Sequence, residues 1–402
     1  MRQAGSYSDL RALPRAVWVL AAGSLINRFG SFVLPFLVLY LRHHEYTAGE
    51  AGVALAVYGL GKIAAAPTGG FLTDRLGPRD TTVLSMFLSA ATMLTLWQSV
   101  HLGPLAVYGA ALLAGWASEL YRPSISALIA ASVEPGPQQV RAFAVYQLGA
   151  SIGLALGPAV GGVVATHSFA PLFIADAATS AIWAVVSLAA LPGGQRLRVK
   201  VGDSAVAVML RDRAFVRFWV AALLVNVILF QAESTFPLWV TANDHSSAVY
   251  GALLGMSAAL TVLFQLPLTR VTDRLPPWRV LAVGNLLAGV GFGILSFGGD
   301  VILLVVSVLI WSSCQMLSWP VASAWVTGHA PPGMVGRYAG ARSLTFGFGL
   351  TIAPVFGVTL YQVSPRLLWL SCLALGVAAT ALLIQPNPTR QRPLTFQTAS
   401  VR

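Results

Sequence analysis

Long apolar runs alternate with short polar segments along the whole chain. Each run has about 20 or more mostly apolar residues, the length that an α-helix needs to cross about 30 Å of hydrocarbon. This pattern predicts twelve membrane-spanning helices. Their expected positions are 16–41, 48–73, 80–99, 102–131, 138–165, 169–191, 214–240, 248–271, 277–298, 301–328, 336–363 and 366–384.

The longest polar break divides these runs into two sets of six. It begins with Pro192-Gly193-Gly194, which stops a helix, and continues as a basic segment. We therefore predict four parts of the chain. They are an N-terminal six-helix bundle at 1–191, a cytoplasmic linker at 192–213, a C-terminal six-helix bundle at 214–385 and a cytoplasmic tail at 386–402.

A short charged loop occurs once in each set of helices. Thr73-Asp74-Arg75-Leu76-Gly77-Pro78-Arg79 is nearly repeated as Thr272-Asp273-Arg274-Leu275-Pro276-Pro277-Trp278-Arg279, 199 positions later. Other features recur after 196 or 197 positions, among them Gly157-Pro158 as Ala353-Pro354 and Arg122-Pro123 as Trp319-Pro320. Internal repeats of this kind are typical of secondary transporters, which bind their substrate between the repeats. The predicted fold class is an all-α integral membrane protein, with 12 transmembrane helices in two pseudo-symmetric six-helix bundles.

Composition supports a membrane protein. Hydrophobic residues make up 56% of the chain and charged residues only 10%, whereas soluble domains carry about 25% charged residues. The net charge of +11 comes from basic clusters between the apolar runs, which indicates membrane orientation rather than nucleic-acid binding. Twenty of the 25 basic residues lie on one predicted side, and only Arg42 and Arg366 lie in connections on the other. We expect a multi-pass protein of the cell membrane with both termini cytoplasmic.

Neither a cofactor nor a metal site is expected. Cys314 and Cys372 both lie in apolar runs, and no histidine pair has the helical spacing of metal ligands. We expect the partners to be a small-molecule substrate, protons and the lipid bilayer, with no nucleic acid, and we expect the protein to be a monomer.

Two motifs resemble signatures of the major facilitator superfamily, and the resemblance covers essentially the whole chain. The loop residues Gly70, Asp74, Arg75, Gly77 and Arg79 resemble its signature G-x-x-x-D-R-x-G-R-R, with Pro78 at the first terminal Arg position. The resemblance implies the 12-helix facilitator fold and alternating access between two bundles. The second motif is similar at every specified position to the signature of the proton-coupled drug antiporters, and consists of Gly153, Gly157, Pro158, Gly161 and Gly162.

Both motifs also suit a gate on physical grounds. Gly70 permits close helix approach, and Gly77-Pro78 suits a tight turn. Asp74 can bond the start of a helix, or an Arg, in the other bundle and so hold that side closed. In the second motif, glycines at a spacing of four form a smooth helix face that Pro158 can bend.

Six ionisable residues lie at membrane depth, where charge is costly and is functional by default. They are Arg28, Lys62, Glu119, Arg122, Asp176 and Glu233. Glu119 and Arg122 are three positions apart and can pair on one helix face. Lys62 is expected to pair within the first bundle. We predict proton coupling at Glu233, Glu119 and Asp176, with Glu233 as first choice because its own predicted helix offers it no charged neighbour.

A central cavity is expected between the bundles. In the facilitator fold the first, fourth, seventh and tenth helices line this cavity, so the resemblance places polar and aromatic residues of these helices there. The predicted cavity residues are Arg28, Asn27, Arg122, Gln231, Gln315, Trp116 and Trp311.

These observations predict a secondary active transporter that is not an enzyme. We expect proton-coupled efflux of hydrophobic or amphiphilic small molecules. A proton-coupled carrier of an anionic or zwitterionic metabolite or peptide is the alternative, because Arg28, Lys62 and Arg122 concentrate positive charge in the first bundle. An ATP-driven pump is excluded, since Gly61-Lys62 lacks the rest of a phosphate-binding loop and lies inside a predicted membrane helix.

Overall fold

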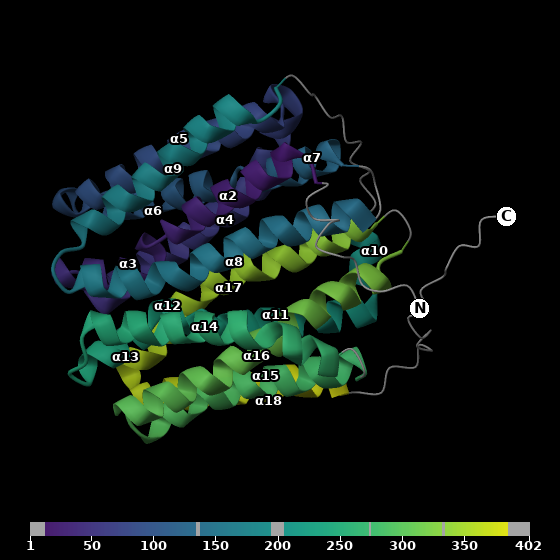
Figure 1. Cartoon of the computed structure of the whole chain (residues 1–402). Helices are drawn as coiled ribbons and strands as arrows, with labels where there is room; N and C mark the ends of the chain where they lie inside the picture. Colours follow the sequence, from purple (N-terminus) through teal and green to yellow (C-terminus); the bar gives the residue numbers. More distant parts are fainter. Residues whose placement is uncertain (1–12, 134–136, 194–204, 273–274, 332–333, 385–402) are drawn as a thin grey trace.

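The computed structural model describes residues 13–133, 137–193, 205–272, 275–331 and 334–384, and these ranges contain helices and no strand (Figure 1). Eleven of its helices are long and apolar enough to cross a membrane. The remaining predicted span, 102–131, is present as two shorter helices, α6 and α7. The predicted tail at 386–402, residues 194–204 of the predicted linker and the pair Asp273-Arg274 lie outside the described residues.

The helices form two bundles. The first contains α2 (Arg15–Phe29), α3 (Val33–His43), α4 (Ala48–Leu76), α5 (Pro78–Ser99), α6 (Pro104–Glu119), α7 (Arg122–Ser132), α8 (Pro137–Ala165) and α9 (Ala170–Ala190). The second contains α11 (Arg213–Leu229), α12 (Gln231–Ser234), α13 (Phe236–Ala242), α14 (Ser247–Thr272), α15 (Pro277–Gly293), α16 (Val301–His329), α17 (Val335–Val363) and α18 (Pro365–Ile384). The short α10 (Ala205–Arg211) precedes α11. We name the end of the molecule where α9 ends and α11 begins the linker end.

Three of the predicted spans are interrupted near their middle. Breaks separate α2 from α3, α6 from α7, and α11 from α12 and α13. Proline explains two of them, because it has no N–H to bond the carbonyl four residues earlier. Pro123 leaves the carbonyl of Glu119 without this bond, and Pro237 does the same for Glu233. Two intramembrane carboxylates therefore lie at helix breaks.

The two bundles repeat the same packing. In α8, Gly153 lies against the backbone of Leu25 and Phe29, where an added Cβ would be 2.7 Å from the Phe29 nitrogen. Its counterpart 196 positions later, Gly349 of α17, lies against Asn226 and Phe230 of α11. This repetition matches the pseudo-symmetry expected from the sequence.

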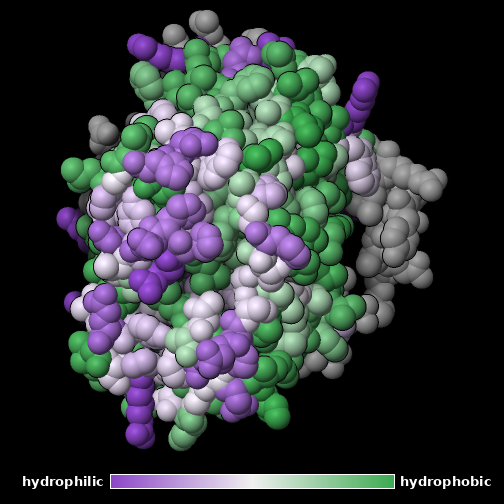
Figure 2. Space-filling model, turned by 90° about the vertical axis from the view of Figure 1, so that its left-hand side faces the viewer, coloured by the Kyte–Doolittle hydropathy of each residue, from purple (hydrophilic) through white to green (hydrophobic). Residues whose placement is uncertain are grey.

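The bundles pack closely at the end opposite the linker end. Tyr250 of α14 donates a hydrogen bond to the Pro35 carbonyl of α3 at 3.0 Å and to the Ala232 carbonyl at 2.9 Å. Beside it, α8 and α14 cross backbone to backbone at Gly162 and Gly251. Figure 2 looks onto this end, where hydrophilic side chains gather next to hydrophobic ones.

The bundles also touch along α4 and α17. This crossing extends from Gly52, against Val358, to Gly347, against Ile63. Nearer the linker end, a Cβ added at Gly70 or Gly340 would meet nothing within 4 Å among the described residues, so these two glycines do not pack against the other bundle.

Candidate functional site

Glu119 is the centre of a charge cluster in the first bundle. Its carboxylate pairs with Lys62 Nζ at 3.3 Å, and it accepts hydrogen bonds from Arg122 Nε and, at 3.3 Å, Arg122 Nη2. Glu119 itself is only 9% exposed. The pairing of Glu119 with Arg122 agrees with the sequence expectation, as does the pairing of Lys62 within the first bundle.

Close helix packing positions Lys62. Gly61 fits against the backbone of α6, with an added Cβ 2.7 Å from the Trp116 nitrogen, so α4 and α6 approach closely. The Lys62 ammonium also lies 5.5 Å from the centre of the Tyr58 ring, which adds a cation–π contact. The Tyr58 hydroxyl in turn lies 3.2 Å from Ser118 Oγ.

The cluster carries more positive than negative charge. Arg28 donates to the Tyr121 hydroxyl at 3.4 Å and is near enough to Glu119 and Arg122 for their charges to interact. Three cations, Arg28, Lys62 and Arg122, thus share one carboxylate. The Arg122 side chain is 59% exposed, so part of this excess charge is accessible to a ligand.

Glu233 stands apart from this cluster on α12. Its Oε2 atom is buried and has no hydrogen-bond partner among the described residues. Lys62 of the first bundle is the cation that lies toward Glu233 across the bundle interface, but no ion pair joins the two.

Asp176 of α9 lies beside the start of α3. It is only 5% exposed, and its carboxylate faces the backbone of Val33, the first residue of α3. The N–H groups at a helix start lack intrahelical partners and carry partial positive charge, so a buried carboxylate stabilises them. The break in the first predicted span is thereby supported from α9.

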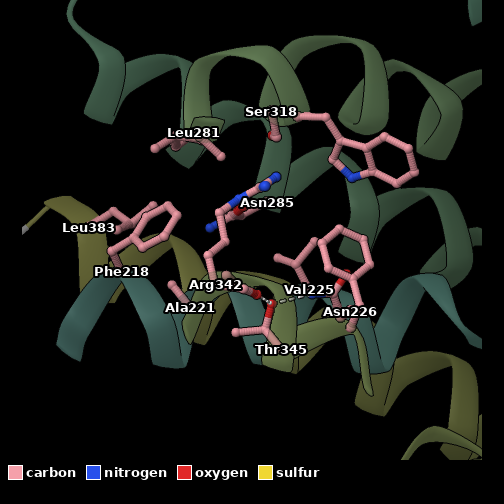
Figure 3. A pocket seen from close by; sticks show the side chains of 14 residues that line it. Phe218, Ala221, Val225, Asn226, Leu281, Asn285, Ser318, Arg342, Thr345 and Leu383 are labelled. Atoms are coloured by element: carbon pink, nitrogen blue, oxygen red, sulfur yellow. Dashed lines mark hydrogen bonds between the residues drawn. The ribbon is translucent and has the colours of Figure 1, made fainter. Parts of the chain in front are cut away.

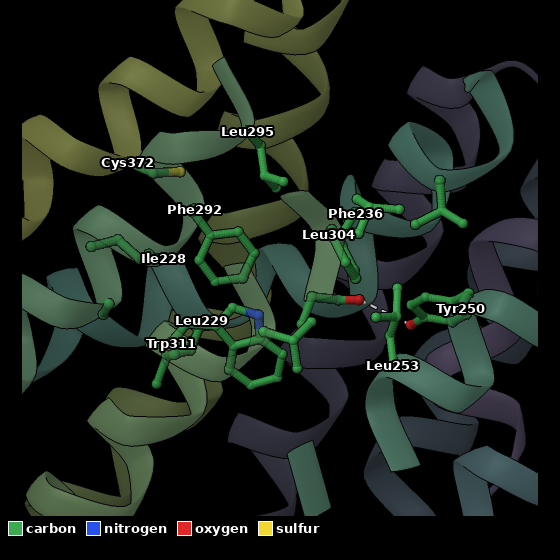
Figure 4. Packing of buried hydrophobic residues seen from close by; sticks show 14 of the residues in the cluster. Ile228, Leu229, Phe236, Tyr250, Leu253, Phe292, Leu295, Leu304, Trp311 and Cys372 are labelled. Atoms are coloured by element: carbon green, nitrogen blue, oxygen red, sulfur yellow. Dashed lines mark hydrogen bonds between the residues drawn. The ribbon is translucent and has the colours of Figure 1, made fainter. Parts of the chain in front are cut away.

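Three predicted cavity residues are packed inside the protein, and we correct the sequence expectation for them. Asn27 donates to Ser180 Oγ at 3.2 Å within the first bundle. Gln231 is fully buried and bonds Val227, Ala353, Ser234 and Thr235. Trp311 is 2% exposed and stacks on Phe292 (Figure 4). Their side chains serve helix packing, so they do not line an open cavity.

Besides Arg28 and Arg122, two predicted cavity residues are partly accessible. Trp116 donates from its indole nitrogen to Thr68 Oγ1 of α4 at 2.9 Å. Gln315 is half-buried on α16. Both remain candidates for contact with a substrate.

The charged loop forms a tight turn at the linker end. Gly77 has φ +91°, a conformation that favours glycine, and Pro78 begins α5 directly after it. Arg75 lies over the Phe71 ring at 4.8 Å, and Arg79 Nε is 2.8 Å from Asp80 Oδ1. Asp74 is exposed and makes no ion pair with any residue in the described ranges. The expected contact of Asp74 with the other bundle is therefore not made in this arrangement.

The glycine motif of α8 lies at two contacts. Gly153, Gly157 and Gly161 face α2 and α3, where Gly161 lies against Phe32 and Phe36. Gly162 faces the other bundle at Gly251, whose added Cβ would lie 2.7 Å from the Pro158 carbonyl. The motif thus joins the first bundle internally and touches the second at the closed end.

Sequence reasoning missed a cleft within the second bundle (Figure 3). It is a narrow cleft, partly open to solvent, among α11, α15, α16, α17 and α18. Arg342 of α17 extends into it. The sequence reading treated Arg342 only as one of the orienting basic residues, although it lies within the predicted span 336–363, and that position was the available signal.

Comparisons with known proteins agree with this architecture. The family model of the Major Facilitator Superfamily matches residues 20–246 and 234–400. The multidrug resistance protein MdtH of Aeromonas hydrophila is 25% identical over 384 residues, which cover 94% of this chain and 96% of that protein. A Na(+), Li(+), K(+)/H(+) antiporter of Planococcus maritimus is 23% identical over 364 residues, 80% of this chain and 84% of the relative.

A solved structure shows the same fold. The crystal structure of a POT family transporter in complex with a thioalcohol-conjugated peptide has a TM-score of 0.78 at 14% identity, and the match covers 93% of this chain and 98% of that one. The family match, the apolar helices and the two-bundle fold together identify a multi-pass membrane carrier rather than an enzyme. The chain belongs to the Major Facilitator Superfamily.

Proposed function

We propose that the protein exports hydrophobic or amphiphilic small molecules in exchange for protons. The observation that carries this proposal is Glu233, an intramembrane carboxyl at a helix break with one buried oxygen that lacks a partner among the described residues. An ionised carboxylate in such a place is costly unless it is paired or protonated. As its access to water changes, Glu233 can bind and release the coupled proton.

Lys62 connects this proton to the movement of the bundles. It pairs with Glu119 in its own bundle, and we infer that its charge also attracts Glu233 in the other. When Glu233 is ionised, its attraction for Lys62 draws the two bundles together at this depth. When Glu233 is protonated that attraction is lost, and Lys62 remains with Glu119. The equilibrium between the two arrangements then depends on protonation, as alternating access requires.

The motifs supply the gate. We infer that the linker end faces the cytoplasm and that Asp74 meets the start of α17 when that end closes. In the described arrangement, Gly162 and Gly251 hold the opposite side shut. Relatives named as a multidrug resistance protein and as a cation/H+ antiporter support export and proton exchange.

Reconstituted protein tests the proposal. Liposomes with an imposed pH gradient are supplied with methyltriphenylphosphonium, naphthalene-2-carboxamide or naphthalene-2-sulfonate, each compared with protein-free liposomes. We expect gradient-driven transport by the wild type, and we expect Glu233→Gln to lose this transport while it keeps substrate exchange without a gradient. Glu45→Gln, an exposed acid at the opposite end, is the matched control. Full gradient-driven transport by Glu233→Gln would refute the role of Glu233.

A carrier of anionic or zwitterionic metabolites or peptides is the second candidate. The observation that favours it is the excess of positive charge around Glu119, where three cations share one carboxylate. The same substrate panel separates the two proposals. Transport of the sulfonate alone, in the same direction as the protons, would support the second candidate against the first.

A further inference from the structure

The cleft of the second bundle holds a cation without a counter-charge. Arg342 is half-buried, and its guanidinium group forms no hydrogen bond or ion pair with any described residue. Its one ring contact is with Phe346, 5.7 Å away. A guanidinium group offers five N–H donors in a planar fork that fits a carboxylate or sulfonate. To leave such a group partly out of water and unpaired is costly, so its presence requires an explanation.

The neighbours of Arg342 are polar but uncharged. Figure 3 shows Arg342 extending from α17 toward Asn285 of α15, with Ser318 of α16 on the same side of the cleft. Asn226 of α11 borders the cleft below and donates to Thr345 Oγ1 at 2.9 Å. An anion placed at Arg342 would thus meet further hydrogen-bonding groups from other helices of the bundle.

Apolar and aromatic side chains form the rest of the wall. Trp319 and Phe346 meet edge to face with ring centres 5.8 Å apart. Phe218, Leu281 and Leu383 line the part toward the linker end. One charged group surrounded by aromatic and aliphatic surface fits a ligand with an anionic head and an apolar body.

We propose that this cleft binds amphiphilic organic anions, aromatic carboxylates or sulfonates, with the anionic group on Arg342 and the apolar body against Trp319 and Phe346. The inference rests on the proposed export function and narrows its substrate class. The cleft is partly open to solvent, so a ligand can reach it.

Binding to detergent-solubilised full-length protein tests this site without any gradient. The probes are naphthalene-2-carboxylate, its neutral carboxamide and naphthalene-2-methylamine, which share one ring system. We expect the carboxylate to bind about tenfold or more tightly than the carboxamide, since hydrogen bonds to a charged group are the stronger kind. The amine should bind more weakly still. Equal binding of all three probes would overturn the proposal.

Variants assign the preference to Arg342. We expect Arg342→Gln to remove the preference for the carboxylate, and Arg342→Lys to keep a reduced preference, because lysine retains the charge but not the fork. Arg366→Gln removes an exposed arginine at the far end of α18 and should behave as wild type. Since Arg342 has no ionic partner among the described residues, Arg342→Gln should unfold at the same temperature as the wild type, or a higher one. A carboxylate preference that survives in a folded Arg342→Gln would overturn the assignment.

The anion site and the proposed function can be refuted separately. If the wild type shows no preference for the carboxylate but still transports neutral or cationic amphiphiles along a pH gradient, only the anion site is refuted. If it binds the carboxylate but shows no gradient-driven transport, only proton coupling is refuted.

Discussion

The two bundles treat their buried cations differently. In the first, Lys62 and Arg122 close on Glu119, and Arg28 lies beside them. In the second, Arg342 projects into a cleft, and no acidic residue in the described ranges pairs with it. The folds of the bundles are equivalent, so packing does not explain the difference. It indicates a division of roles, in which the first bundle balances charge internally and the second leaves a charge for a ligand.

Removal of the shared carboxylate should have the largest effect. Glu119→Gln leaves Lys62 and Arg122 without their counter-charge, and for the largely buried pair with Lys62 the loss of one partner costs about 3–5 kcal/mol. We expect a marked loss of thermal stability. A second change, Lys62→Met in the same chain, should restore part of that loss because it removes a stranded cation. If Glu119→Gln unfolds like the wild type, the cluster is not balanced as described.

Paired glycine substitutions test whether the bundles are as equivalent as their packing indicates. At Gly153 an added Cβ would meet Leu25 and Phe29, and at Gly349 it would meet Asn226. Overpacking costs about 1–3 kcal/mol, so Gly153→Ala and Gly349→Ala should each lower stability by a similar amount. Only Gly349→Ala should also weaken naphthalene-2-carboxylate binding, since Asn226 borders the cleft.

Gly109→Ala is the control, because a Cβ there meets nothing within 4 Å in the described structure. If the two variants lost clearly different amounts of stability, the packing of the two bundles would not be equivalent.

A smaller effect is expected where the second bundle does balance its charges. At the linker end, Asp212 precedes α11 and accepts hydrogen bonds from His329 Nε2 at 2.8 Å and from the Tyr338 hydroxyl at 3.1 Å. Partial burial alone would raise the pKa of Asp212, but the hydrogen bonds from Phe215, His329 and Tyr338 together hold that pKa below its usual value.

The sign of the pH effect follows from this lowered pKa. The stabilisation by Asp212 is complete above its unfolded pKa of about 3.9 and is lost as the pH falls through the lower folded pKa. We expect Asp212→Asn to keep the helix cap, to lose about 1 kcal/mol at neutral pH and to flatten the fall in stability below about pH 4. Thermal unfolding measured from acid to neutral pH gives the loss at neutral pH and the fall in acid. If the stability of Asp212→Asn fell below about pH 4 as steeply as that of the wild type, Asp212 would not be the group responsible.

The sequence was sufficient for the architecture but not for the orientation of individual side chains. Hydrophobic run length and the repeated loop predicted the spans and the two bundles. The break between α6 and α7 could also have been read from Pro123, four residues after Glu119. Pairing of Glu119 with Arg122 followed from their spacing alone.

Side-chain direction at membrane depth was harder to predict. Asn27, Gln231 and Trp311 were assigned to the cavity because they lie on the expected helices, yet each points into its own bundle and finds its partners there. Period and composition cannot distinguish a polar side chain that bonds a neighbouring helix from one that faces a cavity. Arg342 was missed for the converse reason: a basic residue two turns into a helix was read as part of the flanking charge.

Proton release on substrate binding tests the central claim most directly. Purified protein in weakly buffered detergent solution is mixed with whichever panel compound it transports, and a pH-sensitive dye reports released protons. Proton release by the wild type and by Glu45→Gln, with none from a substrate-binding Glu233→Gln, is the predicted result. Equal release from Glu233→Gln and the wild type would contradict the account, because the coupled proton would then reside elsewhere.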